Sequence, residues 1–306
     1  PSHPTLSPPP ERPSMTPPLT DLNVLLSNDD GIRAPGIQAL HQSLMDPDQD
    51  RGGPLFHECF VVAPLTVQSA TSHGVTFHEP LMVQDVDVNP HMTGVAVDGR
   101  PADCVKLALS SIWPERFGHD QLPDLCISGM NAGANCGINT IYSGTVAAAL
   151  EAAFLGVPSV AVSLHIGRGR PDFNRAADIA RSVILRLLAH RDELLAPPSC
   201  LNVNIPVCDE LADPPTPDQP DVVVCPMNTH GLVDRYEKRV SPSGDTYYWS
   251  AGDGLRFLAS DEGTDVAEMF QRRVTVTPIG YDLTQHNRLN TWRNRLPTTT
   301  TTTPPP

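Results

Sequence analysis

The chain has 306 residues, of which 40% are hydrophobic, so it can bury a sizeable core. Its formal net charge is -14, and without a basic stripe such a chain is a poor candidate for electrostatic binding of a nucleic-acid polymer. The N-terminus carries no charged-then-apolar signal, and no run of 18 apolar residues occurs anywhere. We therefore predict a cytoplasmic protein with no membrane-spanning segment.

Both ends of the chain have compositions that cannot form a packed core. Residues 1–19 are rich in proline with scattered serine and threonine, and residues 298–306 are a low-complexity run of threonine and proline. We predict disorder for both segments. Between them we predict an α/β core over residues 21–230, followed by a hairpin and a C-terminal oligomerisation arm over residues 231–290.

Strands and helices alternate through the predicted core. In chain order we expect a strand at 23–27, a helix at 35–45, a strand at 59–63, a helix at 101–111, a strand at 125–128, a helix at 145–155, a strand at 159–164, a helix at 172–190 and a strand at 201–205. The proline-rich stretch 211–220 is predicted to be a surface loop. This alternation of strands and helices predicts a three-layer α/β fold of the Rossmann-like class, with a largely parallel sheet and helices on both faces.

The pattern changes after about residue 230. Two β-prone runs, 236–240 and 246–250, flank turn-forming residues and predict a hairpin. A short helix is predicted at 264–270, with Thr264 at its start, and a strand at 273–278. An arm that leaves the sheet and returns suits subunit contact or exchange better than an independent domain.

The seven cysteines are widely scattered and include no C-x-x-C pair. This arrangement argues against a disulfide framework or a zinc ribbon. Because most of them lie in apolar runs, we interpret them as small buried hydrophobic residues.

The first motif that could carry chemistry follows the predicted strand 23–27. It consists of two adjacent carboxylates, Asp29 and Asp30, and then Gly31. Acids at the C-terminal end of a buried strand lie where open parallel sheets place their ligands. Their oxygens suit a hard divalent cation such as Mg²⁺ or Mn²⁺. A plain turn is the alternative, although a turn without function rarely has two charges at a buried strand end.

A loop rich in hydroxyl groups follows the predicted strand 59–63. Ser69 could offer a weak oxygen ligand to a cation, and His73 could act as an acid or a base. Taken in isolation, an ordinary polar loop with a solvent-facing histidine is the better interpretation.

A loop rich in glycine and asparagine follows the predicted strand 125–128. Gly129, Gly133 and Gly137 recur every four residues, and Asn131 and Asn135 share that interval. Glycine lets backbone amides approach an anion closely, and asparagine offers both a carbonyl ligand and amide donors. The spacing matches neither G-x-G-x-x-G nor a Walker A loop. The regular interleaving favours a binding loop over a merely flexible one.

Ser143, Gly144 and Thr145 open the predicted alanine-rich helix. Free amides and hydroxyls at a helix N-terminus bind phosphate oxygens well. The alternative is simple N-capping by Ser143 or Thr145, and the two roles are compatible.

Taken together, these segments resemble the SurE family of survival-protein 5′-nucleotidases. The resemblance covers about residues 21–285 and keeps the same order along the chain. The matching stretches are 27–37, 69–73, 99–105, 131–137, 143–146, 239–249, 264–265 and 274–278. The chain departs from frequent family patterns at Leu65, Thr66, Ala132 and Ala134.

The resemblance implies a divalent-metal-dependent phosphatase, a 5′-nucleotidase acting on nucleoside monophosphates, in a homodimer or homotetramer with an exchanged C-terminal arm. It implies that one cation, Mg²⁺ or Mn²⁺, is held by Asp29, Asp30, Ser69 and Asn131. It also implies a phosphate site lined by Ser143, Gly144 and Thr145, with Asn135 nearby. Asp29 and Asp30 are the candidate catalytic residues, and Asp29 is preferred for orienting or deprotonating the attacking water.

Two other classes of protein stay open. One is a catalytically inactive regulator that binds nucleotides or phosphate, which an assay of phosphate release would separate from an enzyme. The other is a dinucleotide-dependent oxidoreductase on a doubly wound sheet. The acidic pair after the first strand and the lack of a G-x-G-x-x-G turn count against the second.

Overall fold

The structure, a computed structural model, describes residues 21–119, 121–196, 198–233, 235–251 and 256–296. The predicted disordered segments 1–19 and 298–306 lie outside these residues. None of the described helices is long and apolar enough to cross a membrane.

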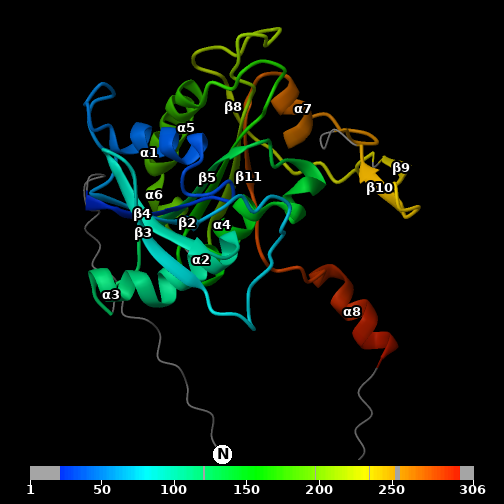
Figure 1. Cartoon of the computed structure of the whole chain (residues 1–306), viewed down its shortest axis with the longest axis horizontal. Helices are drawn as coiled ribbons and strands as arrows, with labels where there is room; N and C mark the ends of the chain where they lie inside the picture. The colour runs from blue at the N-terminus through cyan, green and yellow to red at the C-terminus, as the bar shows by residue number, and fades with distance from the viewer. Residues whose placement is uncertain (1–20, 120, 197, 234, 252–255, 297–306) are drawn as a thin grey trace, which may run out of the picture.

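A nine-stranded sheet forms the centre of the molecule, with the strand order β3-β4-β2-β1-β5-β6-β7-β11-β8 (Figure 1). Its strands are β1 (Asn23–Ser27), β2 (Glu58–Pro64), β3 (Met82–Asn89), β4 (Met92–Asp98), β5 (Leu125–Ala132), β6 (Ser159–Leu164), β7 (Cys200–Ile205), β8 (Val222–Val224) and β11 (Val274–Pro278). Pairing is parallel from β4 through β7 and between β11 and β8. It is antiparallel between β3 and β4 and between β7 and β11. The predicted largely parallel sheet is confirmed.

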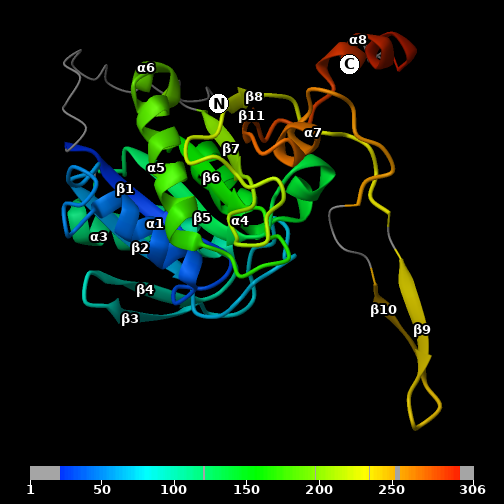
Figure 2. The same ribbon diagram turned by 90° about the horizontal axis from the view of Figure 1, so that it is seen from above.

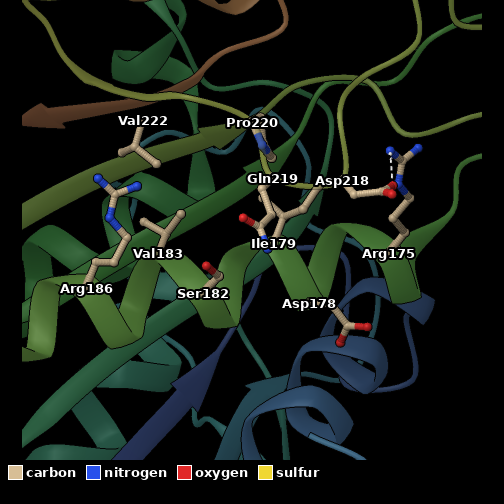
Figure 3. Close-up of a pocket in the computed structure, with 10 residues that line it drawn as sticks. All are labelled: Arg175, Asp178, Ile179, Ser182, Val183, Arg186, Asp218, Gln219, Pro220 and Val222. Carbon is tan, nitrogen blue, oxygen red and sulfur yellow. Dashed lines mark hydrogen bonds and ion pairs between the residues drawn. The ribbon is translucent and has the colours of Figure 1, made fainter.

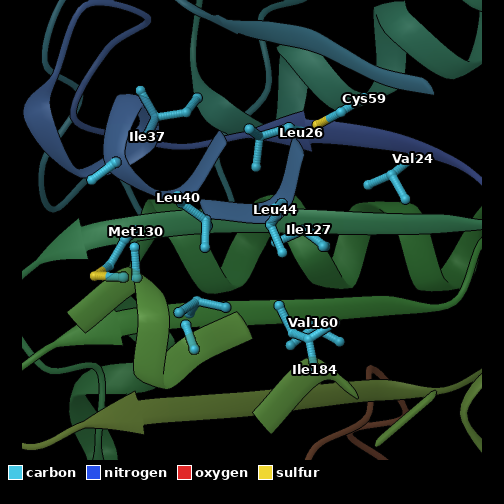
Figure 4. Packing of buried hydrophobic residues seen from close by; sticks show 14 of the residues in the cluster. Val24, Leu26, Ile37, Leu40, Leu44, Cys59, Ile127, Met130, Val160 and Ile184 are labelled. Atoms are coloured by element: carbon cyan, nitrogen blue, oxygen red, sulfur yellow. The ribbon is translucent and has the colours of Figure 1, made fainter. Parts of the chain in front are cut away.

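Helices cover both faces of this sheet. Helices α1 (Pro35–Met45) and α5 (Phe173–Leu188) pack on one face, and α2 (Pro101–Leu107) and α4 (Gly144–Phe154) pack on the other. Because successive strand residues point to opposite faces, β1 serves both layers. Leu26 packs in the cluster under α1 and α5, shown in Figure 4, whereas Leu25 packs in the cluster under α2 and α4. The three-layer α/β fold is therefore as predicted.

The predicted helix 101–111 is longer than expected and changes its winding. After α2, a π-helical stretch covers Ala108–Ile112 and leads directly into α3 (Trp113–Phe117). Pro114 has no N–H group, and its ring crowds the carbonyl one turn earlier. The wider turn before Pro114 accommodates that crowding without ending the helix.

Several elements were not anticipated from the sequence. They are β3, β4, β8, the 3₁₀ helix Gly137–Tyr142, α6 (Arg191–Leu194) and α8 (His286–Arg295). Strand β3 buries only Val86. It therefore lacks the alternation of buried apolar and exposed polar residues by which a strand is recognised in a sequence. It is defined by its antiparallel pairing with β4. The predicted loop 211–220 forms no helix or strand.

The C-terminal part leaves the sheet and returns to it. Strands β9 (Tyr236–Val240) and β10 (Thr246–Ser250) form the predicted hairpin, whose strand residues are all exposed and which projects from the body in Figure 2. Helix α7 (Asp265–Phe270) then leads into β11, which pairs with β7. Helix α8 buries no residue. The division of the chain into a core and an oligomerisation arm stays a prediction.

All seven cysteines are free and buried. Burial raises the pKa of each thiol, with the smallest rises at Cys200, Cys208 and Cys225, to about 11. The interpretation of the cysteines as buried hydrophobic residues is confirmed.

Candidate active site

Four segments that are far apart in the sequence meet at the carboxyl edge of the sheet. Strand β1 lies between β2 and β5, so the segments that follow these three strands are neighbours. They carry Asp29 and Asp30 after β1, Ser69 in the loop after β2, and Asn131 at the end of β5. The N-terminus of α4 contacts the same place through Thr145.

Asp29 is the most deeply buried of the predicted metal ligands, with 4% of its surface exposed. Its Oδ1 accepts a hydrogen bond from the Thr145 hydroxyl. Burial raises the pKa of Asp29 to about 6; the Thr145 bond opposes this rise and the charge of Asp30 adds to it. A buried carboxylate next to a second carboxylate has an unfavourable charge, which a bound cation would neutralise.

Asp30 and Asn131 are held close to each other by backbone contacts. Asp30 Oδ2 accepts the N–H of Ala132 at 2.8 Å, and burial raises the pKa of Asp30. Asn131 Nδ2 donates to the carbonyl of Gly133 at 2.7 Å. Since the nitrogen of the amide makes this bond, the Asn131 Oδ1 is the atom that remains for a cation.

Ser69 is exposed and follows a residue that is bonded to the backbone of Asp29. The N–H of Gln68 donates to the carbonyl of Asp29 at 2.7 Å, which brings the loop against the end of β1. Within the described parts of the chain, no cluster of three or more His, Cys, Asp or Glu side chains could hold a metal. A cation at this edge would therefore use the oxygens of Ser69 and Asn131 beside two carboxylates. Such an all-oxygen set fits Mg²⁺ or Mn²⁺.

The start of α4 approaches Asp29 very closely. Ser143 is the N-cap, and its side chain accepts the N–H of Val146 at 3.1 Å. A Cβ atom on Gly144 would lie 2.9 Å from the Cβ and 3.1 Å from the Oδ2 of Asp29, so only glycine fits without displacing that carboxylate. N-capping by Ser143 is confirmed, whereas the hydroxyl of Thr145 bonds to Asp29 instead.

Asn135 is fixed by the two strands beside it. Its Nδ2 donates to the Ser163 hydroxyl at 2.8 Å, and its N–H donates to Asn204 Oδ1 at 2.8 Å. Its carbonyl accepts a hydrogen bond from Asn202 Nδ2 at 2.7 Å. These contacts give Asn135 a clear structural role, and its contribution to a phosphate site stays a prediction.

Two residues near the site have roles that the sequence did not reveal. Asp265, at the first position of α7, accepts the N–H groups of Gly137 and Asn228, each at 2.8 Å, and so fixes the end of the asparagine loop. His73 is exposed, as expected for a loop histidine, but its Nε2 also bonds to the buried Glu151 Oε2 at 2.7 Å. Spacing and composition do not reveal this role of Asp265, since its partners are 128 and 37 positions away in the sequence.

An open hollow lies directly beside Asp30. Most of its lining is apolar, and it consists of Asp30, Gly31, Arg33, Ala34, Pro35, Gly36, Leu65, Thr66, Val67, Ala132 and Phe173. A second hollow, between α5 and residues 218–222, includes none of the predicted site residues (Figure 3). There Arg175 pairs with Asp218 at 3.2 Å. Of these two hollows, the one beside Asp30 is lined by a predicted site residue.

Fold and site together define an α/β protein with an oxygen-rich site at the carboxyl edge of its sheet. The family model described as Survival protein SurE matches residues 24–230. A 5′-nucleotidase SurE from Heliobacterium modesticaldum is 40% identical over 267 residues, which cover 87% of this chain and 89% of the relative. A 5′-nucleotidase SurE from Rhodopirellula baltica is 39% identical over 277 residues, which cover 89% of this chain and 98% of the relative.

A solved SurE structure also matches this chain. The crystal structure of the SurE protein from Aquifex aeolicus superposes with a TM-score of 0.68 at 32% identity, covering 89% of this chain and 99% of that chain. The chain belongs to the SurE family.

Proposed function

We propose that this chain is a 5′-nucleotidase, which hydrolyses nucleoside 5′-monophosphates to nucleosides and phosphate with the help of one divalent cation. The observation that carries the proposal is the meeting of Asp29, Asp30 and Asn131 with the N-terminus of α4 at one edge of the sheet. The relatives described above are named 5′-nucleotidases, which favours turnover over the alternative of an inactive regulator.

The predicted metal ligands, Asp29, Asp30, Ser69 and Asn131, would hold the cation, Mg²⁺ or Mn²⁺. A divalent cation supplies positive charge that stabilises the charge developing on a phosphate group and lowers the pKa of water. The buried position of Asp29 supports this assignment, because among the described residues its carboxylate pairs with no cationic side chain.

The protein's own groups would bind and orient the phosphate. The N-terminus of α4 offers backbone N–H groups and the positive end of the helix dipole to phosphate oxygens. Gly144 lets those groups lie against Asp29, and Thr145 fixes the orientation of the Asp29 carboxylate. Asp29 would then orient the water that attacks phosphorus in line and accept its proton.

The apolar hollow beside Asp30 is the place we assign to the nucleoside part of the substrate. Leu65 and Val67 are 40% and 62% exposed there, and they offer a surface on which a base can pack. We further propose that the protein is cytoplasmic and forms a homodimer or homotetramer. Seven free, buried thiols suit a reducing compartment, and the exposed hairpin and α8 suit contact with a second copy.

The direct test is phosphate release from AMP by the full chain with added Mn²⁺. We expect activity that is lost on chelation with EDTA and restored by the metal. Asp30→Asn should lower kcat/KM by more than about 100-fold, because a carboxylate ligand is lost. Asp50→Asn is a matched control at an exposed acid outside the site. AMP binding without phosphate release from the wild type would favour the inactive regulator.

A further inference from the structure

A fully buried carboxylate with two partners lies outside the proposed catalytic machinery. Glu151, in α4, is 1% exposed. Its Oε2 bonds to His73 Nε2 at 2.7 Å, and its Oε1 pairs with Lys106 Nζ at 3.2 Å. His73 comes from the loop between β2 and β3, whereas Lys106 comes from α2. A buried carboxylate requires such partners, because its burial without them is strongly unfavourable.

The position of Glu151 excludes a direct catalytic role. It lies eight residues after the N-cap Ser143, which corresponds to about 12 Å along an α-helix. The Nε2 atom of His73 is occupied by this carboxylate. This geometry favours a positioning role for the pair.

The loop that carries His73 also carries Ser69, and its backbone is strained. Ala70 has φ of 57° and Ser72 has φ of 53°, in the left-handed region that residues with a Cβ atom avoid. Two such residues within three positions persist only where surrounding contacts hold them. The segment from Ser69 to His73 thus depends on its anchors for its shape.

The anchors lie on both sides of Ser69. Before it, the N–H of Gln68 donates to the carbonyl of Asp29 at 2.7 Å. After it, the N–H and the hydroxyl of Ser72 donate to the carbonyls of Tyr142 and Ile141, at 3.1 and 2.7 Å. The bond from His73 to Glu151 adds an anchor that ends on a fully buried side chain.

We propose that His73 and Glu151 act as positioning residues for the cation site, forming a clamp that holds Ser69 against Asp29. This inference rests on the proposed function, because it takes Ser69 to be a ligand. Lys106 shares the same carboxylate from α2, and among the described residues it bonds to no residue of the segment from Ser69 to His73. Lys106 therefore serves as a control for His73. Removing either residue disturbs the buried charge of Glu151, but we expect only the loss of His73 to move Ser69.

The test compares His73→Ala with Lys106→Met in the full chain, using Mn²⁺ affinity from titration calorimetry, the thermal midpoint and the kinetics of AMP hydrolysis. For His73→Ala we expect Mn²⁺ affinity to fall about tenfold, as is usual when the support of a ligand is lost. Its kcat at saturating Mn²⁺ should stay within about twofold of the wild type. Lys106→Met should lower the thermal midpoint without changing Mn²⁺ affinity.

His73→Gln provides the rescue, because the amide nitrogen of glutamine can replace Nε2 as a donor to Glu151. It should restore most of the Mn²⁺ affinity and also serves if His73→Ala does not fold. Equal Mn²⁺ affinities for the wild type and His73→Ala, or equal losses in His73→Ala and Lys106→Met, would overturn the clamp. Failure of the wild type to bind Mn²⁺ and hydrolyse AMP would instead overturn the proposed function, and the clamp with it.

Discussion

Single side chains at the candidate site make several contacts each, which explains why particular residue types occur there. Asp29 accepts the Thr145 hydroxyl with its side chain and the Gln68 N–H with its backbone carbonyl. A substitution at Asp29 would therefore disturb α4 and the loop after β2 together. Asp30 has a simpler environment, with one bond from the N–H of Ala132, and is the better residue for testing the role of a carboxylate.

His41, buried in α1, should make the stability of the fold depend on pH. Burial, reinforced by the nearby His91, lowers the pKa of His41 to about 4, from 6.5 in an unfolded chain. Above pH 6.5 His41 is neutral in both the folded and the unfolded chain, and the free energy of unfolding has its full value. As the pH falls from 6.5 toward 4, the unfolded chain binds a proton at His41 and the folded chain does not, so the free energy of unfolding decreases. Between pH 7 and pH 5 the loss amounts to about 2 kcal/mol.

Denaturant unfolding of the wild type and His41→Gln at both pH values measures this effect. The wild type should lose about 2 kcal/mol more than the variant between pH 7 and pH 5, whatever their difference at pH 7. His119→Gln, at an exposed position, is the control and should behave as the wild type. The same pH dependence in the wild type and His41→Gln would contradict the assignment.

Among the elements, those with a strong hydrophobic pattern were predicted with their bounds, and those defined by a partner were not. Strand β1 and helix α1 have the predicted bounds, because a buried run and a helix with proline at its start are local signals. Strand β3 and the 3₁₀ helix Gly137–Tyr142 have no such signal, since their positions depend on β4 and on Asp265. The bond from Asp265 to Gly137 joins residues 128 positions apart, which composition and spacing cannot reveal.

The junction of α4 with β1 gives a prediction for Gly144. Its missing side chain allows the helix to lie against Asp29 and Pro101, which a Cβ atom would approach to 2.9 Å. Gly144→Ala should therefore displace the Asp29 carboxylate, lower Mn²⁺ affinity and activity, and cost about 1–3 kcal/mol of stability. Titration calorimetry with Mn²⁺ and denaturant unfolding measure the two effects.

Gly280→Ala is the matched control for that substitution, because a Cβ atom there meets nothing within 4 Å. It should leave both Mn²⁺ affinity and stability unchanged. Wild-type Mn²⁺ affinity in Gly144→Ala would mean that the close approach of α4 to Asp29 is not required for the site.

On the scale of the whole molecule, the hairpin and α8 are difficult to explain in a solitary chain. Tyr248 and Trp249 on the hairpin are each 61% exposed, and α8 exposes Trp292 by 48%. Figures 1 and 2 show both elements standing away from the body. The sequence predicts an arm from its order of strands and turns. In the proposed oligomer the surface that would receive it belongs to another copy, which one chain cannot reveal.

Deletion of residues 283–306 tests the part of the proposed arm that contains α8. Because α8 buries no residue in the chain, its removal should leave the fold of each subunit intact. The full chain should sediment with two or four times the mass of one chain, and the deletion should shift the population toward smaller species. An unchanged mass after deletion would mean that α8 is not needed for the assembly, and circular dichroism would verify that the truncated chain still folds.

The most direct test of the account is a crystal structure of the full chain soaked in Mn²⁺, with anomalous scattering used to locate the ion. We predict one peak at the carboxyl edge of the sheet, with oxygens of Asp29, Asp30, Ser69 and Asn131 at ligand distances of about 2.0–2.6 Å. A peak bound elsewhere, or these side chains pointing apart with no ion between them in crystals of an active preparation, would contradict the proposed site.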